Sequence, residues 1–291
     1  MVFLFVAIAV VTATTPGLAY KKLGLAGGPV TAPFLPAFWF LPLSLAFGIW
    51  SAIRGDWFWG TEMLFPVILG AFASFITAFC LLESLRRNSF SLAIIIINLS
   101  FVFPIIMSLI YPGEKVGIFQ LIGMLLAIAV IIFMNAGKGD LRGTFMALFF
   151  AVMSSLGNGT IQYAIKLSRI LAPEMPDPNY FCYVYGLATV LSLLVTGFLC
   201  LIGKKPDFGP DMRKITLRCA PVIAVSNGFC FFSQSRLATM MNAAMEFTII
   251  TTLTIVLSLL ADGIINRTKL TWKDWVSLAL CGVVIFFQCI A

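Results

Sequence analysis

Long apolar segments alternate with short polar connections along the whole chain. A helix needs about 20 apolar residues to cross the hydrocarbon layer of a bilayer, so runs bounded by charge, Gly or Pro predict membrane-spanning helices. We predict ten, near residues 1–20, 33–53, 63–83, 88–111, 116–135, 143–166, 179–203, 215–234, 238–261 and 271–290. Pro36, Pro42 and Pro104 fall in the second and fourth runs, where each must kink a helix or line a cavity.

Composition agrees with this pattern. Hydrophobic residues make up 60% of the chain and charged residues only 11%, whereas a soluble domain is about 25% charged. The mean hydropathy is +1.03. The sequence therefore predicts an all-α integral membrane protein with ten transmembrane helices and no separate soluble domain.

The basic residues predict an orientation. The loops after the first, third, fifth, seventh and ninth spans hold most of the 19 Lys and Arg residues, which favours a cytoplasmic location for these loops and places both termini outside. The first run lacks a basic segment before it, which favours a retained span over a signal peptide. We expect a multi-pass protein of the cell (inner) membrane. The net charge of +7 is scattered over span ends, so no nucleic-acid partner is expected.

Catalytic and metal-binding patterns are missing from the sequence. The chain has no histidine, and its seven cysteines form no CxxC pair. No phosphate-cradling loop occurs, and no pair of carboxylates stands at helical spacing. We therefore expect no enzyme activity, no cofactor and no metal, and we expect transport to be driven by an ion gradient or by the solute's own gradient.

Two parts of the chain match each other. Residues Asn88 to Met134 align without a gap with Asn242 to Gln288, and Asn and Lys fall at equivalent places in both copies. Five spans per copy reverse the direction of entry, so the second copy is inverted. We predict two inverted five-helix repeats, residues 1–135 and 143–291, joined by residues 136–142. Such repeats leave a solute site near the midplane that opens alternately to either side.

Local motifs resemble the EamA-like repeat of the drug/metabolite transporter superfamily. They are the segment from Leu82 to Ala93, the span containing Pro104, and the segment from Gly113 to Gly123 that begins Gly-Glu. The second copy is similar but has Arg267 and Thr268 in place of the Gly-Glu pair. The resemblance does not identify the substrate. Our leading hypothesis is an alternating-access carrier of small metabolites or drugs, an exporter of amino acids or related compounds. The alternatives are a membrane-embedded enzyme or lipid-handling protein, and a passive channel.

Glu246 is the leading candidate for the residue that couples transport to an ion or binds the solute. It lies about two turns inside the ninth predicted span, where a charge costs about 2.5–3.5 kcal/mol on insertion scales. There it can bind a proton, another cation or the amine of a solute. The alternative is a structural ion pair with Arg236 or with a lysine at a helix end.

Neutral polar residues inside the spans are candidates for contact with the solute, with helix-to-helix hydrogen bonding as the alternative for each. Those in the sixth span recur at spacings of three or four and form one polar stripe. The candidates are Asn88, Asn98, Asn242 and Thr248, together with Asn158, Gln162 and Tyr163 of the stripe. The expected partners are a small-molecule solute, protons or another coupling ion, and the lipid bilayer.

Overall fold

A computed structural model describes residues 1–28, 31–87, 96–135, 145–204, 206, 208–265 and 272–290. These residues form helices and no strands. The helices are α1 (Val2–Thr14), α2 (Gly17–Ala26), α3 (Ala37–Arg54), η1 (Thr61–Met63), α4 (Leu64–Arg87), η2 (Leu99–Phe101), α6 (Val102–Ile110), α7 (Ile118–Asn135), α8 (Phe145–Leu171), α9 (Asp177–Leu201), α10 (Pro210–Leu237), α11 (Ala243–Ile265) and α12 (Trp272–Ile290).

Seven helical segments among the described residues are long and apolar enough to cross a membrane. The first of these combines α1 and α2, which are separated by a break at Thr15 and Pro16. Three shorter apolar helices cover 96–110, 118–133 and 243–258. Of the prolines singled out above, Pro36 precedes α3, Pro42 lies inside it, and Pro104 lies in the first turn of α6.

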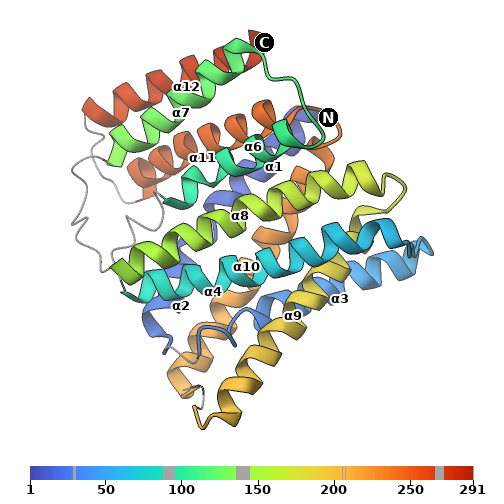
Figure 1. Ribbon diagram of the computed structural model, residues 1–291. Coiled ribbons are helices and arrows are strands. Elements are labelled where there is room, and N and C mark those ends of the chain that lie inside the picture. Colours follow the sequence, from blue (N-terminus) through green and yellow to red (C-terminus); the bar gives the residue numbers. More distant parts are fainter. Residues whose placement is uncertain are drawn as a thin grey trace.

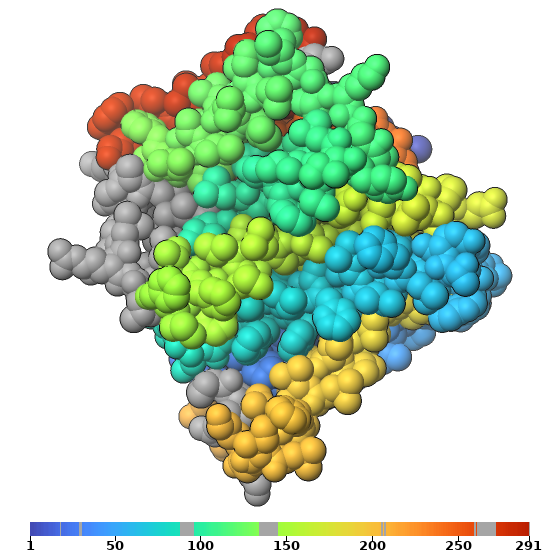
Figure 2. All heavy atoms as spheres, in the orientation of Figure 1, coloured from blue at the N-terminus to red at the C-terminus, as the bar shows by residue number. Residues whose placement is uncertain are grey.

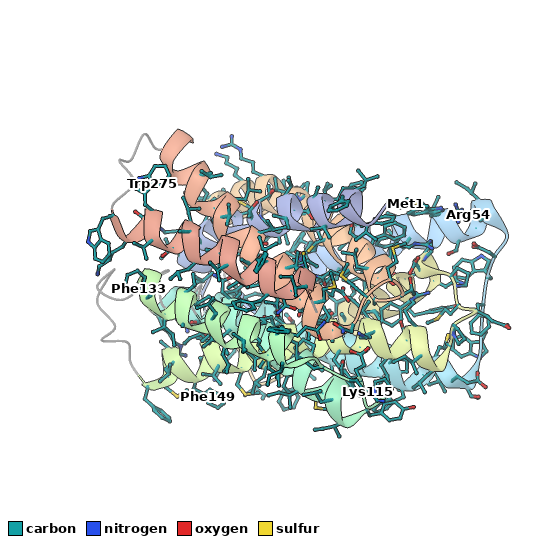
Figure 3. The ribbon with its side chains drawn as sticks, turned by 90° about the horizontal axis from the view of Figure 1, so that it is seen from above. Met1, Arg54, Lys115, Phe133, Phe149 and Trp275 are labelled. Carbon is teal, nitrogen blue, oxygen red and sulfur yellow. The ribbon has the colours of Figure 1, made fainter. Side chains whose placement is uncertain are left out.

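The helices lie roughly along one direction. In Figure 1, α7 and α12 lie together at one edge and α3 and α9 at the opposite edge, with α4, α8 and α10 between them. Figure 3 places Met1, Arg54 and Lys115 at one end of the bundle, and Phe133, Phe149 and Trp275 at the other. We call these the Arg54 end and the Phe149 end. The predicted loop order assigns the same two groups of residues to opposite sides of the membrane.

The outer surface carries large apolar side chains, as a lipid-facing surface requires. Phe3 is 89% exposed and Leu194 is 64% exposed, and both belong to membrane-length segments. On the face shown in Figure 2, side chains fill the space between α4 and α8. The apolar solvent for these residues is lipid, because a soluble monomer rarely exposes so continuous an apolar surface.

Small residues let α8 lie close to its neighbours, as is common between membrane helices. A Cβ atom added at Gly159 would lie 2.7 Å from both the Phe103 Cβ and the Ser100 carbonyl oxygen. One added at Gly157 would lie 3.1 Å from the Ala73 carbonyl oxygen of α4. These glycines bring the middle of α8 against the helices that form the site described below.

Gly159→Ala is expected to destabilise the fold by about 1–3 kcal/mol, because backbone atoms must separate to admit the methyl group. The measurement is the apparent Tm of the purified protein in detergent. Gly197→Ala on α9 is the matched control, since its Cβ would meet nothing within 4 Å. Equal Tm values for the two variants would show that the close approach of α8 contributes nothing to stability.

Candidate functional site

A cavity of about 270 Å³ lies among the helices. Its lining comes from α1 and α2, α3, α4, the residues around η2, α8, α9, α10 and α11. This volume is slightly below the roughly 300–1,000 Å³ of pockets that hold drug-sized ligands. The cavity therefore suits a metabolite-sized molecule, and residues from both ends of the sequence enclose it.

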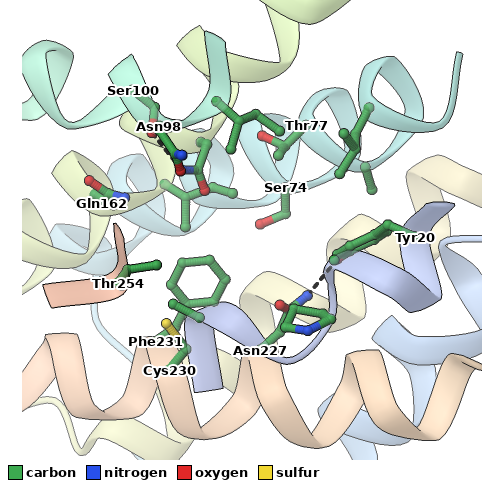
Figure 4. Close-up of a pocket in the computed structure, with 18 of the residues that line it drawn as sticks. Tyr20, Ser74, Thr77, Asn98, Ser100, Gln162, Asn227, Cys230, Phe231 and Thr254 are labelled. Atoms are coloured by element: carbon green, nitrogen blue, oxygen red, sulfur yellow. Dashed lines mark hydrogen bonds between the residues drawn. The ribbon is translucent and has the colours of Figure 1, made fainter. Parts of the chain in front are cut away.

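The polar lining residues lie near the middle of their helices. Asn158 lies midway along α8, Thr77 lies in α4 and Thr254 midway along α11. Asn158 donates a hydrogen bond from Nδ2 to Ser100 Oγ at 2.7 Å. Across the cavity, Asn227 donates from Nδ2 to the Tyr20 hydroxyl at 2.9 Å, as Figure 4 shows. These bonds fix the two amides on facing walls.

Several lining residues keep a buried polar atom without a hydrogen-bond partner among the described residues. They are Ser74 Oγ, Gln162 Oε1, Gln234 Oε1 and Thr254 Oγ1. Native proteins satisfy nearly all buried polar groups. Ser74, Gln162 and Thr254 lie around the same space in Figure 4, so a polar solute there would meet several unsatisfied groups at once.

Aromatic rings form another part of the wall. Phe40 of α3 stacks on Tyr185 of α9 with ring centroids 5.6 Å apart, and Tyr20 meets Trp39 edge to face at 5.8 Å. Phe40, Tyr185 and Tyr20 all line the cavity. The combination of amides, hydroxyls and rings can hold a solute that has both hydrogen-bonding groups and an apolar part.

The structure brings three of the predicted residues together. Asn98, Asn158 and Gln162 all line the cavity. Tyr163, predicted on the same stripe, is outside the lining and donates instead to the Tyr111 carbonyl oxygen at 3.2 Å. Asn88 lies outside the described residues.

The other predicted residues gather at the start of α11. Asn242 Oδ1 accepts a hydrogen bond from the Met245 backbone N–H at 2.9 Å, which caps the helix. Glu246 and Thr248 are 1% and 0% exposed. Neither Asn242, Glu246 nor Thr248 lines the cavity.

Two groups of ion-paired side chains lie at the Arg54 end. Lys166 Nζ of α8 lies 2.5 Å from Glu114 Oε1 in the connection before α7. Asp177, at the start of α9, binds Arg169 at 2.8 Å and Arg236 at 2.6 Å. The sixth predicted span ends at Lys166, but α8 continues to Leu171, and Lys166 is only 3% exposed.

Sequence reasoning missed part of the lining. Tyr20, Ser74 and Thr77 line the cavity but are absent from the predicted set. The signal for Tyr20 is the break between α1 and α2 at Thr15 and Pro16, because interrupted membrane helices often mark a binding site. Ser74 and Thr77 lie three residues apart on α4, a spacing that places both on one helical face.

Comparison with known proteins shows a shared fold and a partial match to one transporter family. A solved crystal structure aligns with a TM-score of 0.72 and 15% sequence identity, covering 99% of this chain and 96% of that one, so the two share a fold. No curated protein matches the chain. The family model described as the EamA-like transporter family matches residues 1–136, which include α1 to α7. Residues 1–136 are thus similar to the EamA-like transporter family, which belongs to the drug/metabolite transporter superfamily.

Proposed function

We propose that this protein is a secondary-active, alternating-access transporter of small metabolites, and that it exports amino acids or related compounds. The observation that carries the proposal is the mid-membrane cavity of about 270 Å³, with unsatisfied amide and hydroxyl groups in its wall. A solute that binds there can be released to either side when the surrounding helices rearrange.

We further propose that residues 1–135 and 143–291 are inverted five-helix repeats. The seven membrane-length segments and the three shorter apolar helices supply one helix for each of ten positions. Helix contacts recur in the pairs that a two-fold axis requires: α4 with α8 and α10 with α1, α4 with α9 and α10 with α3, α6 with α8 and α11 with α1. This reciprocity supports the repeat independently of the sequence alignment.

The arrangement corresponds to a conformation facing the cytoplasm, if the Phe149 end is the cytoplasmic one, as the basic loops predict. Leu85 and Ser258 extend the lining toward that end of α4 and α11. At the Arg54 end, the pair of Glu114 with Lys166 joins the two proposed repeats. Both termini then lie outside, and a reporter fused at Ala291 should read as extracytoplasmic.

Asn158→Leu is expected to weaken solute binding about tenfold, because it removes an amide from the wall and leaves Ser100 without its donor. Binding is measured by thermal shift with amino acids, other metabolites and cationic drugs, and transport by uptake of a radiolabelled amino-acid mixture into proteoliposomes.

Thr160→Val is the control for Asn158→Leu. Thr160 lies on the same helix, is outside the cavity lining, and donates its hydroxyl only to the Leu156 carbonyl oxygen of its own helix. Equal effects of the two substitutions would remove the cavity from the mechanism. Flux that continues at the same rate without any gradient coupling would favour a passive channel.

A further inference from the structure

We propose that Glu246, Lys166 and Glu114 form a buried proton-binding site one helical turn from the cavity, in which a proton on Glu246 decides which carboxylate holds Lys166. The proposal rests on the transport function proposed above and names its coupling ion. We call these three residues the Glu246 site. Two of them belong to the C-terminal part of the chain, and Glu114 belongs to the N-terminal part.

The first observation is the environment of Glu114. Its Oε1 lies 2.5 Å from Lys166 Nζ, and its Oε2 accepts a hydrogen bond from the Ala243 backbone N–H at 2.9 Å. The Lys166 and Glu114 side chains are 4% and 18% exposed. Glu114 therefore joins α8 to the first turn of α11 through both of its oxygens.

The second observation is the state of Glu246. It follows Ala243 by three residues, so both lie on one face of α11. Glu246 is 1% exposed, and neither carboxylate oxygen has a hydrogen-bond partner among the described residues. Lys166 attracts it electrostatically and Glu114 repels it. Glu246 is thus a buried, unpartnered acid beside an ammonium group that another carboxylate already holds.

In the described part of the chain, the helices that pack against α11 place no other charged group beside Glu246. The described helices α1, α6 and α7, which pack against α11, contain no Asp, Glu, Lys or Arg. The amino group of Met1 belongs to a residue that is 87% exposed, and Lys115 is exposed. Lys273 and Asp274 of α12 lie at the Phe149 end, beside Trp275. The charges that act on Glu246 are therefore those of Lys166 and Glu114.

One ammonium group cannot neutralise both the buried carboxylate of Glu246 and the half-buried carboxylate of Glu114. In apolar surroundings an unpaired carboxylate is strongly unfavourable, so the Glu246 carboxyl group keeps its proton while Lys166 stays with Glu114. Loss of that proton creates a second carboxylate that competes for Lys166. The balance is simple: one proton leaves Glu246, and Lys166 remains an ammonium ion throughout.

The Glu246 site is linked to the cavity along two helices. Gln162 precedes Lys166 by four residues on α8, and Ile250 follows Glu246 by four residues on α11, so each pair shares a helical face. Gln162 and Ile250 both line the cavity. One turn of helix is about 5.4 Å long. Movement of Lys166 between carboxylates would loosen the contact between the two parts of the chain immediately beside the solute.

The direct test is infrared spectroscopy of the purified full chain, titrated from neutral to alkaline pH in Na⁺-free buffer, a range in which ordinary carboxyl groups are already ionised. The probe is the proton itself, and the signal is the C=O stretching band of a protonated carboxyl group. We expect one such band that titrates in the wild type and in Glu174→Gln, a control at an exposed glutamate, and that is lost in Glu246→Gln. A titrating band that persists unchanged in Glu246→Gln overturns the proposal. Suppression of the band by Na⁺ at constant pH also overturns it, in favour of a Na⁺ site.

Transport separates this proposal from the proposed function. With an imposed pH gradient, uptake of a radiolabelled amino-acid mixture into proteoliposomes should lose its gradient dependence in Glu246→Gln while counterflow exchange is retained. A Glu246-dependent band without uptake by the wild type supports the proton site and contradicts the amino-acid transport function. Uptake in Glu246→Gln that still follows the pH gradient supports transport and overturns coupling through the Glu246 site.

Discussion

Asp177→Ala is expected to lower the free energy of unfolding by about 3–5 kcal/mol, because it leaves a buried guanidinium group without its carboxylate. Asp177 is 2% exposed, and its oxygens bind Arg169, Arg236 and the Ser235 hydroxyl at 2.8, 2.6 and 2.5 Å. The Arg169 side chain is only 11% exposed, so most of the loss comes from this residue and less from Arg236, which is 44% exposed. The apparent Tm in detergent should fall by roughly 10 °C.

Asp211→Ala provides the comparison for Asp177→Ala. Asp211 also lies in the first turn of a helix, but it is exposed, so its loss removes only a favourable charge at the helix N-terminus, worth about 0.3–1 kcal/mol. A second substitution, Arg169→Met, should recover part of the stability lost in Asp177→Ala, since it removes the unpaired charge. If Asp177→Ala were as stable as Asp211→Ala, the cluster would have no structural role.

The helices were largely predictable from the sequence, and their ends were not. Apolar runs locate each helix because lipid excludes charge and unsatisfied backbone groups. The sixth run was predicted to end at Lys166, yet α8 continues to Leu171. The reason is that Lys166 and Arg169 are paired with Glu114 and Asp177, which come from other segments. No local pattern on α8 shows that these partners exist.

The candidate site was also predictable from the sequence only in part. Periodicity identified one polar face on α8, and Asn158 and Gln162 of that face do line the cavity. It could not show that Tyr163, only one residue further, donates to the Tyr111 carbonyl oxygen. Successive residues of a helix are rotated by about 100°, so Tyr163 faces a different neighbour from Gln162. Nor could it show that Asn227 faces Tyr20, which lies far away along the sequence.

The Glu246 site predicts that two single substitutions each destabilise the protein much less than the double substitution does. In Glu114→Gln, Lys166 can still form an ion pair, because Glu246 can lose its proton and its carboxylate can then bind Lys166. In Glu246→Gln, Lys166 keeps its ion pair with Glu114. Each single substitution should therefore have a modest effect on Tm. The double variant Glu114→Gln/Glu246→Gln leaves a buried ammonium group with no carboxylate, and it should lose about 3–5 kcal/mol.

The double variant should exceed the sum of its single substitutions by about 1–3 kcal/mol, the size of coupling found among residues of one ion-pair network. Glu114→Gln/Glu174→Gln is the matched control, and it should be additive because Glu174 is exposed. Adding Lys166→Met to the double variant should restore much of the stability, since it removes the charge that has lost both partners. Additive losses, or no recovery with Lys166→Met, would mean that the two carboxylates do not share one lysine. A proton on Glu246 can change the contact between the two parts of the chain only if both carboxylates share Lys166. This contact lies one helical turn from the solute.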